Sequence, residues 1–405
     1  MGYFVENVNF SVTLSLTSLR SFGFWLPDGL TETQRLLYYC YGFGCFLFAL
    51  GSYIISQFVD LFLIWGDLPK MTADACLLFT NLAHFSKIVN IIARKVLIQT
   101  IIDDAHLDLT SDASDEGKKI VERFYDKFRI VVVFFRHTSV HLLNDSLPHV
   151  HNFTCRLFPF QLYPFDVTKS PAYEIVYFHQ VIAVLICGYL NVAKDTLVVT
   201  LIAQCHCRLK LLGLALRTIC NDIDIPGEGL VTHEQEKVVK ARLRDCVRRH
   251  QAALEAAKQL QQAFSEPTFI QFLVSLVIIC VTAFQMVAVI TILYYKSSYS
   301  FSIKYVLSPV ILKLRIKQVV ELNYAVTVSA QWFQSVAVAD AVYAVPWYAC
   351  RLAVRRSLVV MSARSRRAAL LTAGGFTPLS LNSFMAIIKT SYSLFTLLQQ
   401  VEESK

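Results

Sequence analysis

The sequence predicts an all-α integral membrane protein with seven transmembrane helices, a cytosolic N-terminus and an extracellular C-terminus. Of its 405 residues, 55% are hydrophobic and 17% are charged, and the mean hydropathy is +0.48, whereas a soluble domain carries about 25% charged residues. The apolar residues are gathered into runs long enough to cross about 30 Å of hydrocarbon, which takes roughly 20 helical residues. Loops rich in lysine and arginine alternate along the chain with loops that contain few of these residues, and this pattern predicts the orientation.

The first span is the clearest. Leu36 to Val59 holds no formal charge, and no small-residue cleavage site of the kind that ends a signal peptide follows it. The other spans are predicted at about 71–93, 128–147, 174–204, 268–294, within 303–338, and at 379–401. The whole chain, 1–405, then forms one seven-helix membrane domain.

Two of these spans carry charge near their middle. The charges and histidines are Arg136, His137, His141 and Asp145 in the third span, and Lys304, Lys313, Arg315, Lys317 and Glu321 in the sixth window. A charge at mid-bilayer costs about 2.5–3.5 kcal/mol on insertion scales. Either these spans are short and their charges extend to the interface, or the histidines line a water-filled cavity.

The orientation follows from the loops. Those after spans two, four and six hold 6, 10 and 6 lysines and arginines, and the alternate loops hold at most two each. Basic residues accumulate on the cytosolic side. Two glycosylation triplets, beginning at Asn144 and Asn152, lie at or within a loop assigned to the outside, which agrees with this assignment.

Several classes of protein are excluded by what the sequence lacks. There is no phosphate-binding loop, zinc-protease motif or nucleophile elbow, so we predict neither an enzyme nor a cofactor, and no nucleic-acid partner. Cys205, His206 and Cys207 lack a fourth ligand for zinc, so no metal site is expected. A cytosolic N-terminus, together with the missing Asp-Arg-Tyr and Asn-Pro-x-x-Tyr motifs, argues against a G-protein-coupled receptor.

The cytosolic extension between spans four and five, residues 206–265, is predicted to contain a helix with one apolar face. Apolar or weakly polar residues recur at positions 243, 247, 250, 254, 257 and 264, the spacing of one helical face. Basic residues occupy the other face. We expect this helix to pack on its cytosolic neighbours or on another subunit, with His250 as a packing residue.

The last span, 379–401, follows a cytosolic segment, 331–379, that ends in a Gly-Gly-Phe-Thr-Pro break. Glycine pairs and proline end one helix and permit another to begin. Tyr392, Phe395, Thr396 and Gln399 share one face of the new helix. Hydroxyl and amide groups there favour a hydrated path, because water satisfies them, with interhelical hydrogen bonding as the alternative.

Three stretches of the sequence are distinctive. The first is the carboxyl-terminal stretch from Gly375 to Phe384 and from Lys389 to Leu398. The second runs from Pro159 and Phe160 through Tyr163-Pro164-Phe165-Asp166 and Ser170-Pro171-Ala172-Tyr173-Glu174 to Gln180. The third is His250 to Pro267, with its Phe264-Ser265 pair. These three stretches resemble the insect odorant receptors, a seven-span family with this inverted topology.

This resemblance implies a tuning subunit of an odorant-gated, non-selective cation channel in the plasma membrane of sensory neurons. The subunit would bind a small volatile odorant. It would assemble with the shared odorant receptor co-receptor into a hetero-oligomer, expected to be a tetramer, around a central pore. In this family, cytosolic helix extensions form an anchor between subunits and the last helix lines the pore.

The family also implies where the functional residues lie. Its ligand pocket lies among spans two, three, four and six near the outer face, which places there Phe79, His137, His141, Tyr173, Tyr177, Phe178 and Val181. The anchor would include Val247, His250, Leu254 and Phe264. The pore would be lined by Tyr392, Phe395, Leu398 and Gln399, with Phe395 and Leu398 as a hydrophobic constriction that gates by dewetting.

Residues 296–335 depart from the family's pattern, because the sixth span is usually apolar and here contains Lys313, Arg315 and Lys317. Either the chain is divergent there or the gene model joins foreign sequence. Two other functions stay open. One is a gustatory-type receptor, which works without the shared co-receptor. The other is a secondary transporter, although the sequence shows no internal repeat typical of transporters.

Overall fold

The computed structural model describes residues 2–66, 68–110, 114–126, 129, 170–223, 230–295, 336–367 and 371–403. The predicted third span, 128–147, lies outside the described residues except for Arg129. Of the window for the sixth span, only residues 336–338 are described.

The first predicted span lies within a continuous helical run, Glu32–Leu63. The run comprises α2 (Glu32–Phe46), a π-helical turn η1 (Leu47–Gly51) and α3 (Ser52–Leu63), and it follows α1 (Gly2–Ser21). Thr31 begins α2 with a capping box: its hydroxyl accepts from the Gln34 N–H, and the Gln34 side chain accepts from the Thr31 N–H. This pairing satisfies two amide donors that a helix start leaves free.

Long helices set the height of the molecule. After α4 (Leu68–Ala93) and α5 (Lys95–Thr110), residues 115–126 are helical, and α7 (Ala172–Arg217) and α8 (His233–Tyr295) follow. At 1.5 Å per residue, the 46 residues of α7 extend over roughly 70 Å. Because that length is about twice the thickness of a hydrocarbon core, a large part of α7 must project beyond it.

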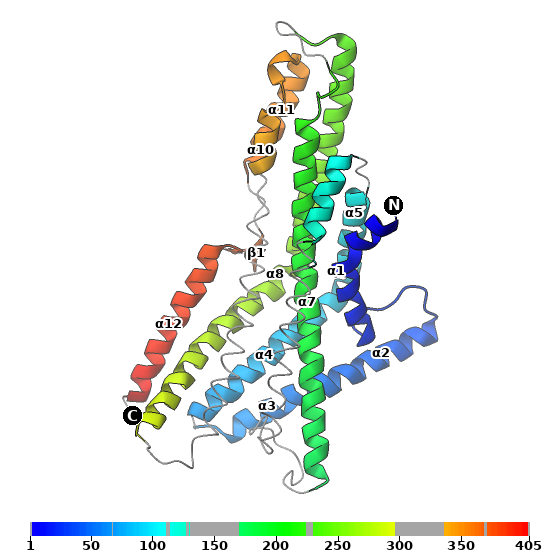
Figure 1. Ribbon diagram of the computed structural model, residues 1–405. Coiled ribbons are helices and arrows are strands. Elements are labelled where there is room, and N and C mark those ends of the chain that lie inside the picture. Colours follow the sequence, from blue (N-terminus) through cyan, green and yellow to red (C-terminus); the bar gives the residue numbers. More distant parts are fainter. Residues whose placement is uncertain are drawn as a thin grey trace.

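The chain is arranged in two tiers along α7 (Figure 1). We call residues 206–217 of α7, residues 233–265 of α8, α10 (Val336–Tyr343), the short 3-10 helix η2 (Trp347–Ala349) and α11 (Leu352–Ser365) the upper tier. The lower tier contains α2, α3, α4, the remainder of α7 and α8, and α12 (Leu381–Glu403), which lies beside α8.

A two-stranded hairpin connects the tiers between α11 and α12. Strands β1 (Thr372–Ala373) and β2 (Thr377–Pro378) pair antiparallel, Thr372 opposite Pro378. Gly374 and Gly375 make the turn with φ of 63° and 83°, values that favour glycine because it has no Cβ. The hairpin occupies the Gly-Gly-Phe-Thr-Pro break that the sequence predicted.

Helices able to cross a membrane are present in the described part of the chain. By length and composition, the runs Glu32–Leu63, Ala172–Arg217 and His233–Val281 each qualify. Exposed apolar residues such as Leu36, Phe43 and Phe62 cover the first run, as expected for a lipid-facing surface. One large buried cluster joins α1, α4, α5, α7, α8, α10 and α11, so a continuous hydrophobic core connects the two tiers.

Candidate functional site

Four of the residues predicted to bind the ligand lie where α7 begins, and Phe79 lies within α4. Tyr173 and Tyr177 stack with ring centroids 6.1 Å apart and are partly buried, as is Val181, whereas Phe178 and Phe79 are exposed. The structure therefore brings the two tyrosines together but leaves Phe178 and Phe79 on the surface. His137 and His141 lie outside the described residues.

His179, beside these tyrosines, connects α7 to the first helical run. Its Nε2 lies 2.9 Å from the Phe48 carbonyl oxygen, and its ring stacks on Tyr53 at 5.8 Å between centroids. His179 was not among the predicted site residues. A histidine near the start of the predicted fourth span was the available signal, because ionisable groups within spans are rare and are functional by default.

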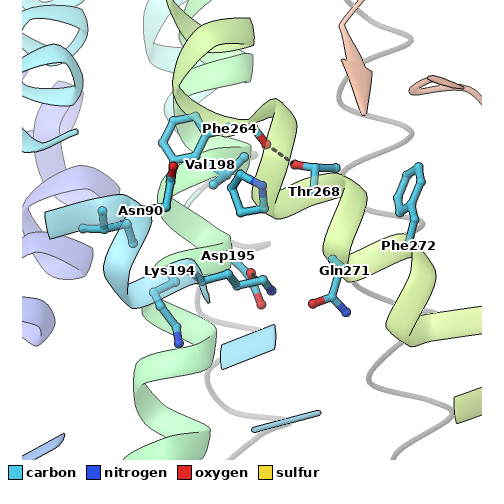
Figure 2. Close-up of a pocket in the computed structure, with 11 residues that line it drawn as sticks. Asn90, Lys194, Asp195, Val198, Phe264, Thr268, Gln271 and Phe272 are labelled. Carbon is cyan, nitrogen blue, oxygen red and sulfur yellow. Dashed lines mark hydrogen bonds and ion pairs between the residues drawn. The ribbon is translucent and has the colours of Figure 1, made fainter. Parts of the chain in front are cut away.

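A pocket of about 490 Å³, counted as all empty space including its open mouth, lies between α4, α7 and α8 (Figure 2). Its apolar lining comprises Ile91, Val198, Phe264, Pro267 and Phe272, and its polar lining Lys87, Asn90, Lys194, Asp195, Thr268 and Gln271. Lys87 is eight residues beyond Phe79, about 12 Å along α4, so this pocket is separate from the predicted ligand region.

An ion pair at this pocket connects α4 to α7. Lys87 Nζ lies 2.8 Å from Asp195 Oδ1, and both side chains are nearly buried. Lys194 is 2% exposed, and its Nζ lies 3.5 Å from the His84 carbonyl oxygen. Breaking a buried pair is destabilising because it leaves one charge uncompensated. The pair therefore holds α4 against α7 where the two tiers meet.

The predicted anchor residues divide between buried and partly exposed positions. His250 and Phe264 are buried, and Phe264 lines the pocket, so their contacts lie within the chain. Val247 and Leu254 are partly exposed. Burial and the nearby positive charge of Arg364 lower the pKa of His250, and its Nε2 has no hydrogen-bond partner in the part of the chain that the structure describes. A neutral packing histidine fits this environment.

Six large apolar side chains of α10, η2 and α11 are exposed in the upper tier. These are Tyr343, Trp347, Tyr348, Leu352, Val359 and Val360, from 43% to 77% exposed. Large exposed apolar patches are typical of surfaces that bind another protein or a membrane. We call these six residues the α11 patch.

The hairpin docks on α8 beside the pocket. The Gly374 N–H donates to the Ser265 carbonyl at 3.0 Å, the Gly375 N–H donates to Ser265 Oγ at 3.1 Å, and Phe269 meets Phe376 edge-on at 5.0 Å. A Cβ on Gly374 would come within 3.0 Å of both phenylalanine rings. The start of α12 is thus fixed to the α8 segment that lines the pocket.

The last helix presents its predicted face to the outside of the chain. Tyr392 is 66% exposed, and Phe395 and Thr396 are partly exposed. Thr396 Oγ1 donates to the Ser393 carbonyl of its own helix at 2.8 Å. Ser391 is instead buried and reaches the Leu276 carbonyl of α8 at 3.2 Å. Among the described side chains of this helix, Ser391 therefore makes the interhelical hydrogen bond, and the predicted face does not. The side chains of Leu398 and Gln399 lie outside the described residues.

These features can be compared with known proteins. A profile of the 7tm odorant receptor family matches residues 67–392, which is most of the chain. The chain belongs to the odorant receptor family. Among curated members, it is 21% identical to odorant receptor Or2 of Anopheles gambiae over 86% of this chain and 89% of that receptor. It is 27% identical to odorant receptor 22c of Drosophila melanogaster over 45% of this chain and 42% of the relative.

Solved odorant receptors have the same fold. The olfactory receptor OR5 of Machilis hrabei in complex with eugenol superposes with a TM-score of 0.74 at 15% identity, covering 98% of this chain and 99% of that receptor. A second structure of the same receptor gives a TM-score of 0.73. The family and multi-pass membrane fold predicted from the sequence are therefore confirmed, and this odorant receptor belongs to a family of receptors, not of enzymes.

Proposed function

We propose that this odorant receptor is the tuning subunit of an odorant-gated, non-selective cation channel in the plasma membrane of sensory neurons. In this proposal it assembles with the shared odorant receptor co-receptor, as a tetramer around a central pore. Family membership supports the binding of odorants. The N-terminus is placed in the cytosol and the C-terminus outside, as the distribution of basic residues predicts.

The observation that carries the assembly proposal is the α11 patch. Tyr343, Leu352 and Val360 are each more than 60% exposed on a tier that projects from the membrane. Water contact with these side chains is unfavourable by about 25 cal/mol per Å² of apolar surface. A partner subunit that covers them removes that cost, and Val247 and Leu254 on the neighbouring α8 extend the surface available to it.

The pore proposal rests on α12. Its face bearing Tyr392 and Thr396 is open to the outside of this chain and makes no hydrogen bond to another helix among the described residues. In a membrane, polar groups need either a protein partner or water. A hydrated path formed together with other subunits supplies the water. We place Phe395, Leu398 and Gln399 in the same pore.

The test is co-expression in cells that lack other odorant receptors. With the co-receptor, a panel of volatile odorants should evoke a cation current and its odour profile should follow this chain. Without the co-receptor, this chain alone should give none. A current from this chain alone would favour a gustatory-type receptor. Substrate uptake coupled to an ion, without channel current, would favour a transporter. Either outcome would overturn the proposal.

A further inference from the structure

A stripe of buried polar side chains runs along the seam between α3 and α4. Tyr53, Gln57 and Asp60 are spaced by four and three residues, so they share one face of α3, and each is at most 3% exposed. On α4, Asp74 and Asn81 are seven residues, or two turns, apart, and share a face in the same way. Asn81 Nδ2 donates to Gln57 Oε1 at 2.8 Å and connects the two faces.

Asp74 is the buried carboxylate of α4 in this stripe. Its side chain is 1% exposed, and neither of its buried carboxylate oxygens has a hydrogen-bond partner among the described residues. Asp60 lies close enough to act on it electrostatically with a charge of the same sign. An isolated buried carboxylate is expensive, and a second carboxylate beside it adds to the cost. An asparagine or leucine at position 74 would avoid this cost, so the fold gives up stability here.

The ligand that would relieve this arrangement is a cation with N–H donors. We propose that Asp74 and Asp60 bind the ammonium group of a protonated amine odorant, an assignment that rests on the odorant-receptor function proposed above. The ammonium satisfies the carboxylate oxygens through charge-assisted hydrogen bonds. The hydrocarbon part of the amine lies along the seam toward Leu78, which is 5% exposed and shares the face of Asp74.

A divalent metal ion fits these residues less well. Calcium takes six to eight oxygen ligands and usually several carboxylates. Within the described ranges, no group of three or more His, Cys, Asp or Glu side chains is arranged to hold a metal ion. One organic monovalent charge instead leaves the amide pair of Gln57 and Asn81 free to stay bonded to each other.

The position of the pair also suits entry from the predicted outer side. Asp60 lies one turn before the end of α3 at Leu63, and Asp74 lies less than two turns after the start of α4 at Leu68. Both carboxylates are therefore near the connection between the two helices, which the charge distribution assigns to the outside. An amine that enters there meets the carboxylates before it reaches the amide pair.

The first test compares matched amines and alcohols on the full channel. Linear, cyclic and aromatic primary amines are paired with alcohols of the same skeleton, such as hexylamine with hexanol and phenethylamine with phenethyl alcohol. At least one amine should evoke a current at a concentration about tenfold lower than its alcohol needs, or lower still. The reason is that a buried charge pair increases affinity by roughly that factor or more. Asp74→Asn should remove this preference, and so should Asp60→Asn. Glu174→Gln, a charge loss at an exposed position of α7, should retain it.

The second test measures binding without any current. Purified wild-type chain should gain thermal stability from the same amine and not from its alcohol or from calcium. Asp74→Asn should be at least as stable as wild type without ligand, because it loses an unsatisfied charge, yet gain nothing from the amine. If no odorant evokes current but the amine still stabilises the wild type, the channel proposal fails and the amine site stands. If each alcohol evokes current at the same concentration as its matched amine, the amine proposal is overturned. It is also overturned if Asp74→Asn responds to amines like wild type.

Discussion

The side-chain amide of Gln261 on α8 holds the backbone of Thr372 through a pair of hydrogen bonds. Gln261 Oε1 accepts the Thr372 N–H at 2.7 Å, and Gln261 Nε2 donates to the Thr372 carbonyl at 2.8 Å. Gln261 is one turn from Phe264, which lines the pocket, and Thr372 begins the hairpin that leads into α12. The relationship therefore connects the pocket-lining helix to the helix that we place in the pore.

Replacement of Gln261 by alanine should weaken this connection. The Thr372 N–H would lose its partner, while the Thr372 carbonyl would keep only the Ser265 hydroxyl as a donor, at 3.0 Å. An unsatisfied N–H costs about 1–3 kcal/mol when it is buried, so we expect a lower melting temperature of the purified chain. If the connection carries the response, the maximal odorant-evoked current per channel at the surface should fall as well. Gln262→Ala, at an exposed neighbouring position, is the matched control. Lower stability with an unchanged current would limit Gln261 to a structural role.

His250 should make the fold sensitive to acid. Burial and Arg364 lower its pKa from the ordinary value of 6.5, so the folded chain binds a proton less readily than the unfolded chain. The contribution of neutral His250 to the free energy of unfolding is fully present above about pH 6.5. It is lost as the pH falls below that value, by at most about 1.4 kcal/mol per pH unit. Melting temperatures at pH 7.5 and 5.5 should differ less in His250→Gln than in wild type. An equal difference in both would contradict the prediction, and His233→Gln, on an exposed histidine, serves as the control.

The α11 patch should be required for assembly. Val359→Asp places a charge in the proposed contact with the co-receptor, where it would be buried without a partner, and should reduce the amount of co-receptor that co-purifies by about tenfold or more. Ser357→Asp adds the same charge at an exposed polar position of the same helix and should have little effect. Val359 is 67% exposed, so the folded chain alone should tolerate the change. Normal co-purification of Val359→Asp would remove the patch from the interface.

The orientation can be tested with epitope tags in intact cells. The loop charges predict that a tag on the N-terminus is hidden until the membrane is permeabilised, whereas a tag on the C-terminus is stained at once. This follows from the retention of basic loops in the cytosol. The opposite staining pattern would reverse every assignment of inside and outside made above.

The spans and the helical faces could be read from the sequence because they are local. The run from Leu36 to Val59 and the break at Gly374 and Gly375 depend on hydropathy and backbone freedom within a few neighbouring residues, and the structure has a helix and a hairpin there. The apolar face of α8 also depends on local sequence, because its residues recur at spacings of three and four. Leu243 and Phe264 of that face are buried.

The partners of the charged residues could not be read in the same way. Lys87 and Asp195 are 108 positions apart, and only the packing of α4 against α7 brings them together. Asp60 and Asp74 were present as charges at the ends of predicted spans, but their burial depends on which face of each helix meets the other. The exposed apolar side chains of α11 were also not selected, because Arg355 and Arg356 interrupt them in the sequence.

The most direct measurement of the central claim, that this chain contributes to a channel pore, is the ion selectivity of the odorant-evoked current when only this chain is changed. Phe395→Ala and Gln399→Ala, each expressed with unchanged co-receptor, should shift the reversal potential between sodium and a larger organic cation or alter block by a pore blocker. Ser391→Ala, at the buried contact with α8, should leave both unchanged. If the two pore substitutions change only the odorant concentration that gives half of the maximal current, α12 couples the ligand and does not line the pore.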